Sequence, residues 1–198
     1  MELTQNPSVL ELVQKTAELT TPKEIVWIDG SEAQLESLRK IAVETGELIK
    51  LNEEKLPGCY LNRSDVNDVA RVEGRTFICS RTRDEAGPTS NWMDPTERKA
   101  QLHEILRCAM AGRTMYVIPY SMGVIGSPFA KYGIEVTDSI YVVLNMAIMT
   151  RIGTKVLDAL GDSSDVILGV HSKVTLDPEN RYIVHFPEEN KIISVNSN

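Results

Sequence analysis

Glu24-Ile-Val-Trp-Ile-Asp29 is the stretch that decides the fold, because it is short, apolar and rich in β-branched and aromatic residues. Such a composition predicts a buried strand. Ser31 and Gln34 follow with the spacing of a capping box, which predicts the start of a helix. That helix has one apolar face and is predicted to end at Gly46. Leu48–Leu51 is expected to be a second strand, so the segment predicts a βαβ unit with a parallel pair.

Helix signals recur on both sides of this unit. Asn6-Pro7 combines a cap residue with proline at the first helical position, and Asp94-Pro95-Thr96-Glu97 is the strongest helix start in the chain. Ser64–Arg71 is predicted to be a short, polar-capped helix. Ser139–Leu160 is expected to form one long helix, and the apolar character of its first half implies burial.

Short apolar runs predict the remaining strands. A loop, Pro187–Asn190, separates the last two and predicts a C-terminal hairpin. The expected fold class is therefore α/β, with a mixed sheet flanked by helices, in one domain over residues 1–198. The predicted strands are Thr76–Ser80, Met115–Pro119, Ile134–Val136, Val166–Val170, Tyr182–Phe186 and Ile192–Val195.

The composition of the chain argues against nucleic acid and membranes as partners. Lys and Arg number 21 against 28 Asp and Glu, which gives a net charge of −7 and no basic footprint for nucleic acid. No apolar run approaches the ~20 residues that a membrane span requires. The first twenty residues lack the features of a secretory signal or transit peptide. Three cysteines without paired spacing are expected to be reduced thiols, and we expect a cytoplasmic protein.

Common catalytic motifs are missing from the sequence. It contains neither a phosphate-binding P-loop, nor a dinucleotide fingerprint, nor a His-Glu-x-x-His zinc motif. His103, His171 and His185 are each expected to be core or surface residues rather than metal ligands. Glycines in the segment Gly123–Gly126 could direct backbone N–H groups at an anion, but a plain tight turn is the favoured interpretation.

Arginines are the better candidates for chemistry. Five of them crowd into 21 positions of an acidic chain: Arg63, Arg71, Arg75, Arg81 and Arg83. A guanidinium at Arg71 could hold a carboxylate or phosphate through two parallel hydrogen bonds. Glu73, two residues later, could orient Arg71 or neutralise it. Solvated surface arginines are the other interpretation of the same pattern.

Longer motifs carry a family resemblance. Asp68-Val-Ala-Arg-Val-Glu73, Ala86-Gly-Pro-Thr-Ser-Asn-Trp-Met-Asp-Pro95, Ser121-Met-Gly-Val-Ile-Gly-Ser-Pro128 and Ile148-Met-Thr-Arg-Ile-Gly153 occur in order. Together with Val26-Trp-Ile-Asp-Gly-Ser31 they make nearly the whole chain resemble the N-terminal region of GTP-dependent phosphoenolpyruvate carboxykinase. One departure is Ile140, where the family usually has proline.

The resemblance implies a reversible reaction in which oxaloacetate and GTP give phosphoenolpyruvate, GDP and CO2, with a divalent cation (manganese or magnesium). It implies that Arg71 binds the substrate and that Glu73 supports closure of the active site. The family's substrate loop, metal ligands, phosphate loop and guanine pocket have no counterpart in this sequence. The chain is thus expected to be one lobe of a larger, monomeric enzyme, without catalytic, cofactor or metal-binding residues of its own, and inactive without its C-terminal lobe.

Two other classes of function stay open at this point. A free-standing anion-binding or regulatory domain would need contacts from Gly123–Gly126 in addition to Arg71. A purely structural domain would dock a partner lobe through an exposed apolar patch.

Overall fold

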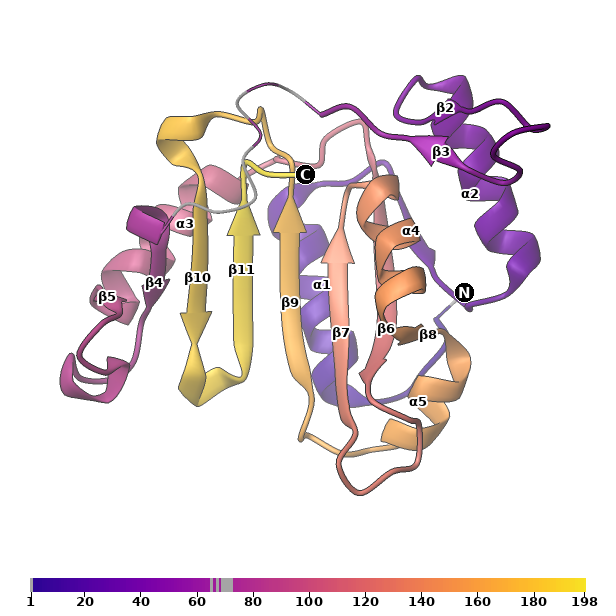
Figure 1. The fold of residues 1–198 in the computed structure, drawn as a ribbon. Coiled ribbons are helices and arrows are strands. Elements are labelled where there is room, and N and C mark those ends of the chain that lie inside the picture. Colours follow the sequence, from indigo (N-terminus) through magenta and orange to yellow (C-terminus); the bar gives the residue numbers. More distant parts are fainter. Residues whose placement is uncertain (1, 65, 67, 69–72) are drawn as a thin grey trace.

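The computed structural model describes residues 2–64, 66, 68 and 73–198. Its core is a nine-stranded mixed sheet with the order β1-β6-β7-β9-β11-β10-β4-β5, with β8 also paired to β6 (Figure 1). The mixed α/β class and the C-terminal hairpin are thereby confirmed. The strands of this sheet are β1 (Glu24–Trp27), β4 (Thr76–Ile78), β5 (Asn91–Trp92), β6 (Thr114–Met122), β7 (Lys131–Thr137), β8 (Arg151–Ile152), β9 (Ile167–Ser172), β10 (Tyr182–Phe186) and β11 (Lys191–Val195).

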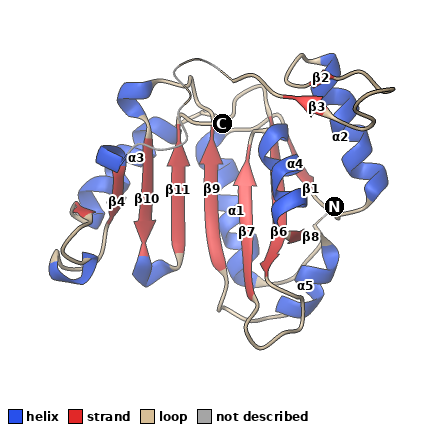
Figure 2. Ribbon diagram, in the orientation of Figure 1, coloured by secondary structure: helices blue, strands red, loops and turns tan. Residues whose placement is uncertain are grey.

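Helices cover the two faces of the sheet unequally (Figure 2). The main core lies between the strands and α1 (Pro7–Thr20), α3 (Pro95–Leu106) and α5 (Thr154–Leu160). A second core lies on the other face, where α4 (Ile140–Met149) covers β6 and packs against α2 (Glu32–Glu44). On that second face a groove of about 600 Å³ remains over β4, β10 and β11.

The helix starts predicted at Asn6, Ser31 and Asp94 are confirmed. The side chain of Asn6 accepts hydrogen bonds from the backbone N–H groups of the second and third residues of α1, and Asp94 does the same for α3. Ser31 accepts from the backbone N–H of Gln34. Each cap satisfies donors that a helix would otherwise leave free at its first turn.

The predicted βαβ unit is wrong in its second strand. β2 (Ile49–Lys50) lies outside the main sheet and pairs with β3 (Tyr60–Leu61) in a separate antiparallel ribbon. The parallel partner of β1 is instead β6, with Glu24 opposite Thr114. A pair of exposed residues carries too little apolar surface to hold a place in the central sheet.

The predicted long helix is also wrong, because it breaks into α4, β8 and α5. β1 and β8 share one edge of β6, so the end of β1 meets the end of β8. A Cβ atom on Gly153 would lie 2.2 Å from the carbonyl oxygen of Asp29, and one on Gly30 would lie 2.5 Å from that of Ile152. Only paired glycines permit this approach of two backbones, and the approach interrupts the helix.

Short 3₁₀ turns complete the connections. They are Glu73–Arg75, Asp84–Ala86, Pro178–Asn180 and Pro187–Glu189. The second lies within the polar loop that precedes α3, and the last forms the loop of the C-terminal hairpin. The helix predicted over Ser64–Arg71 falls mostly on residues outside the described ones.

Candidate functional site

Three strands end at one edge of the sheet in buried polar residues. β7, β9 and β11 are mutually parallel, so their carboxyl ends meet at the top of Figure 1. In open α/β sheets this is the edge at which ligands bind. We call these residues the strand-end cluster. It comprises the last residue of β7, the last two of β9 and the residues that directly follow the three strands. Its members are Thr137, Asp138, Ser139, His171, Ser172, Lys173, Asn196, Ser197 and Asn198.

His171 joins the three strand ends. Its Nδ1 lies 2.7 Å from the hydroxyl of Thr137, and its Nε2 lies 2.9 Å from the carbonyl oxygen of Ser197. Because a carbonyl can only accept, Nε2 carries the proton and Nδ1 accepts from Thr137. Burial lowers the pKa of His171, while Asp138 and the bond to Ser197 act in the opposite direction. The neutral imidazole is therefore the form that fits this site.

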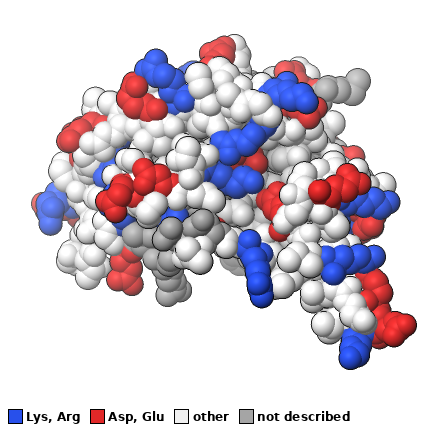
Figure 3. Space-filling model, turned by 90° about the horizontal axis from the view of Figure 1, so that it is seen from above, with Lys and Arg blue, Asp and Glu red and all other residues white. Residues whose placement is uncertain are grey.

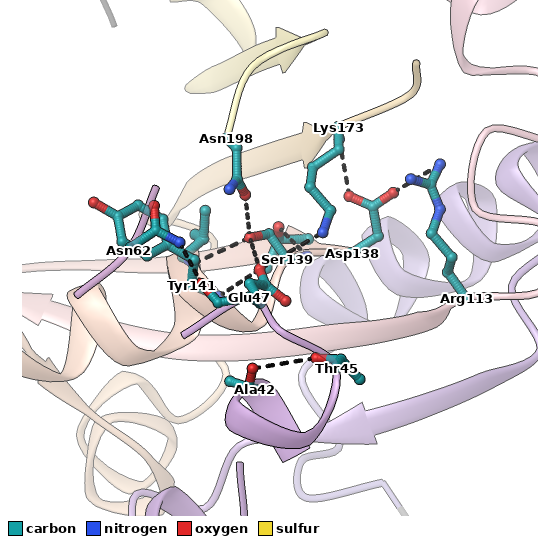
Figure 4. A network of polar contacts seen from close by, with 12 residues as sticks. Ala42, Thr45, Glu47, Asn62, Arg113, Asp138, Ser139, Tyr141, Lys173 and Asn198 are labelled. Atoms are coloured by element: carbon teal, nitrogen blue, oxygen red, sulfur yellow. Dashed lines mark hydrogen bonds and ion pairs between the residues drawn. The ribbon is translucent and has the colours of Figure 1, made fainter. Parts of the chain in front are cut away.

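Asp138 is the central acceptor of the cluster. Its side chain is fully buried and accepts from the hydroxyl of Ser172 at 3.0 Å and from the backbone N–H of Lys173 at 2.9 Å. Arg113 pairs with the same carboxylate at 3.1 Å (Figure 4). A buried carboxylate is stable only when its lone pairs are filled in this way.

Glu47 brings the loop after α2 into the cluster. Its Oε1 accepts from the backbone N–H of Tyr141 at 3.3 Å, and lies 3.4 Å from the hydroxyl oxygen of Ser139 and 3.6 Å from Nζ of Lys173 (Figure 4). The side-chain amide of Asn62 donates to the backbone carbonyl of Glu47 at 2.7 Å. Asn62 is thus held beside α4.

Asn196 fixes the turn that follows β11. Its backbone is left-handed, with φ of 61°, and its side-chain oxygen accepts from the backbone N–H groups of Thr175 and Asp177. Its side-chain amide donates to the carbonyl of Asn180. The tail of residues 196–198 consequently has one position in which these bonds are all made.

Comparison with known proteins identifies the family. Residues 11–198 match the family described as phosphoenolpyruvate carboxykinase N-terminal domain. The chain belongs to that family. It is 51% identical over 194 residues to a phosphoenolpyruvate carboxykinase [GTP] of Anaeromyxobacter dehalogenans, and 47% identical over 204 residues to one of Neocallimastix frontalis. The matches cover 98% and 97% of this chain but 33% and 34% of those relatives, so the chain spans about a third of their length.

Of the residues singled out in this carboxykinase domain, Arg71 lies outside the described residues, but its described neighbours are informative. Oδ1 of Asp68 accepts from the backbone N–H of Asn198 at 3.1 Å, so Asp68 lies against the strand-end cluster. Glu73 is exposed and precedes β4. β10 runs antiparallel to β11, and β4 runs parallel to β10. The amino end of β4, with Glu73, therefore lies at the same edge as Asp68.

The other arginines of the sequence cluster are spread apart. Arg75 pairs with Glu179 at 2.9 Å beside the amino end of β4, whereas Arg81 and Arg83 follow the opposite end of that strand. Seen from above, onto the strand-end edge, Figure 3 shows basic and acidic side chains interspersed rather than a basic field. Of these three described arginines, Arg75 therefore lies at one end of β4 and the other two at the opposite end.

The remaining candidates lie elsewhere. Gly123 and Gly126 form the turn between β6 and β7, at the opposite end of β7 from the strand-end cluster, and the N–H of Gly126 already donates to the hydroxyl of Tyr132. His103 is exposed on α3, and His185 is half-buried in the groove. Among the residues that the structure describes, no three His, Cys, Asp or Glu side chains could hold a metal ion together.

Sequence reasoning missed the strand-end cluster, although a signal was present. Each of three apolar strands runs into polar residues: Val136-Thr-Asp-Ser139, Val170-His-Ser-Lys173 and Val195-Asn-Ser-Asn198. Polar residues at the carboxyl ends of parallel strands point to a functional edge. The expectation of a core or surface role for His171 was too coarse, because it is buried and bonded through both ring nitrogens.

Proposed function

We propose that this chain is the N-terminal lobe, residues 1–198, of a GTP-dependent phosphoenolpyruvate carboxykinase. The observation that carries the proposal is the family match over residues 11–198, together with 51% identity to a carboxykinase of that specificity. The reaction would be that of the family, from oxaloacetate and GTP to phosphoenolpyruvate, GDP and CO2. The parent enzyme would be a cytoplasmic monomer.

In this proposal Arg71 is the substrate contact of the lobe. Both oxaloacetate and phosphoenolpyruvate are carboxylates, and a guanidinium offers them two parallel N–H donors. Support comes from the described neighbours on either side, since Asp68 and Glu73 both lie at the strand-end edge. Glu73, two residues beyond Arg71, is exposed and available to orient the guanidinium.

The nucleotide and the divalent cation, manganese or magnesium, would be held by the other two-thirds of the enzyme. The described residues offer no cluster that fits a metal ion. The described helices likewise include none long and apolar enough to cross a membrane. Alone, the lobe would lack the groups that transfer the phosphoryl group, and we expect it to be inactive.

Isothermal titration calorimetry of this chain with phosphoenolpyruvate tests the role of the lobe. One charged hydrogen-bonded contact contributes ~1.5–3 kcal/mol, whereas millimolar affinity requires about 4 kcal/mol. We therefore expect a Kd weaker than ~1 mM. Micromolar affinity would instead favour the free-standing anion-binding domain.

A chimeric enzyme tests the role of Arg71. Residues 1–198 would replace the matching third of the Anaeromyxobacter dehalogenans carboxykinase, and we expect this chimera to be active. Arg71→Ala should lower kcat/KM for oxaloacetate about a hundred-fold, since a bidentate charged contact is lost. Arg83→Ala is the matched control, because Arg83 is exposed beyond the far end of β4. Equal activity of the two variants would refute the proposed role.

A further inference from the structure

Asn198 connects two parts of the chain that are far apart in sequence. Its backbone N–H donates to Oδ1 of Asp68 at 3.1 Å, and its side-chain oxygen accepts from the hydroxyl of Ser139 (Figure 4). Asp68 stands three residues before Arg71 in the sequence. Asn198 thereby attaches the start of the stretch that leads to Arg71 to the ends of the sheet strands.

The tail that carries Asn198 is itself held by His171. The imidazole donates from Nε2 to the carbonyl of Ser197, while Nδ1 accepts from Thr137. Thr137 also accepts from the backbone N–H of Ser139, the residue that bonds Asn198. A closed circuit of hydrogen bonds therefore runs through Thr137, His171, the tail and Ser139.

The strand-end residues of this circuit are buried, whereas Ser197 and Asn198 are half-buried. Thr137 and Ser139 are fully buried, and His171 is 7% exposed. If the tail shifted, buried donors and acceptors would lose their partners without reaching water, and each such loss is costly. Only one position of the tail, and hence one position of the N–H that Asp68 accepts from, satisfies every group.

We propose that Asp68 and His171 are positioning residues for the substrate arginine. His171 fixes residues 196–198, the tail presents the N–H of Asn198, and Asp68 accepts it, so that the segment continuing to Arg71 starts from a fixed point on the rigid sheet. This inference rests on the proposed function of Arg71. In this proposal Asp68 does not contact the substrate, and His171 acts indirectly, through residues 196–198.

Kinetics of the chimeric carboxykinase test the proposal. Asp68→Ala removes the acceptor, whereas Asp68→Asn keeps an oxygen that can accept from Asn198. We expect Asp68→Ala to raise KM for oxaloacetate about ten-fold, with kcat and KM for GTP changing less than about two-fold. Asp68→Asn should stay close to the parent. Asp162→Ala, an exposed aspartate at the other end of the sheet, is the matched control.

Two outcomes separate the proposals. If Arg71→Ala impairs the enzyme while Asp68→Ala does not, the positioning role is overturned and the proposed function stands. If Arg71→Ala leaves the enzyme unimpaired, the proposed function fails.

Thr137→Val and Thr137→Ser test the His171 end of the circuit, because only serine retains the hydroxyl that donates to Nδ1. Valine should reproduce the rise in KM, and serine should not.

Amide exchange in the 198-residue chain gives a measurement that does not depend on activity. We expect the N–H of Asn198 to exchange slowly in the parent chain and in Asp68→Asn, and rapidly in Asp68→Ala. A chain in which Asn198 exchanges equally fast with and without the Asp68 carboxylate would overturn the proposal.

Discussion

The two ends of the central strands differ in which side chains they bury. At the strand-end cluster, polar residues such as Asp138 and His171 are buried and fully bonded. At the opposite edge, around the turn from β6 to β7, apolar side chains are exposed, with Val124 at 65% and Phe129 at 90%. Buried polar groups tolerate few alternative arrangements, whereas exposed apolar side chains tolerate many. The strand-end cluster is therefore the part of the sheet in which side-chain positions are narrowly fixed.

Asp138→Ala should have the largest effect of the changes that test this contrast. It leaves Arg113 without its carboxylate and Ser172 and Lys173 without an acceptor inside the protein. Arg113 keeps access to water, so the cost comes mainly from the hydrogen-bond donors left without a partner, at about 1–3 kcal/mol each of the free energy of unfolding. Urea denaturation monitored by circular dichroism measures the loss. A loss below about 1 kcal/mol, the range of surface substitutions, would mean that the cluster is as tolerant as the other edge.

Acidification should act on the same edge with a smaller effect. Burial lowers the pKa of His171 below 6.5, so between the lowered pKa and 6.5 the unfolded chain binds more protons than the folded one. The stability that His171 contributes is complete above pH 6.5 and is lost as the pH falls below it. The difference in unfolding free energy between the parent chain and His171→Gln should shrink over this range. A difference independent of pH would show that His171 does not titrate with a lowered pKa.

Phe129→Ser should have the smallest effect. Its side chain is almost fully exposed in the turn, so the free energy of unfolding should change by less than about 0.5 kcal/mol. Thermal unfolding of the two chains at equal concentration measures this. A loss above about 1 kcal/mol would show that the turn packs against the domain, and the contrast between the edges would weaken.

Local signals in the sequence predicted local structure well. The caps Asn6, Ser31 and Asp94 each start a helix where their pattern placed one, because capping depends only on residues within one turn. Strand β10 has the predicted bounds, Tyr182–Phe186. These features need no knowledge of the rest of the fold.

Long-range relations could not be predicted in the same way. The partner of β1 is β6, and nothing in the composition of Glu24–Trp27 specifies a strand that starts at Thr114. The break after α4 depends on Gly153 meeting Gly30, and only the folded backbone brings them together. The strand-end cluster likewise depends on the order β7-β9-β11, although each of its polar stretches is visible in the sequence.

The position of β11 in the sheet determines when the domain can fold during its synthesis. β11 is the strand that joins β9 to β10, and β10 in turn holds β4 and β5. A nascent chain that has not yet released Lys191–Val195 from the ribosome therefore holds two unjoined pieces of sheet. The two partners of β11, β9 and β10, are the strands that directly precede it in the chain, so the sheet closes as soon as this last strand is free. The domain must complete its sheet after nearly all of its residues are made, and until then strand edges are open to other chains.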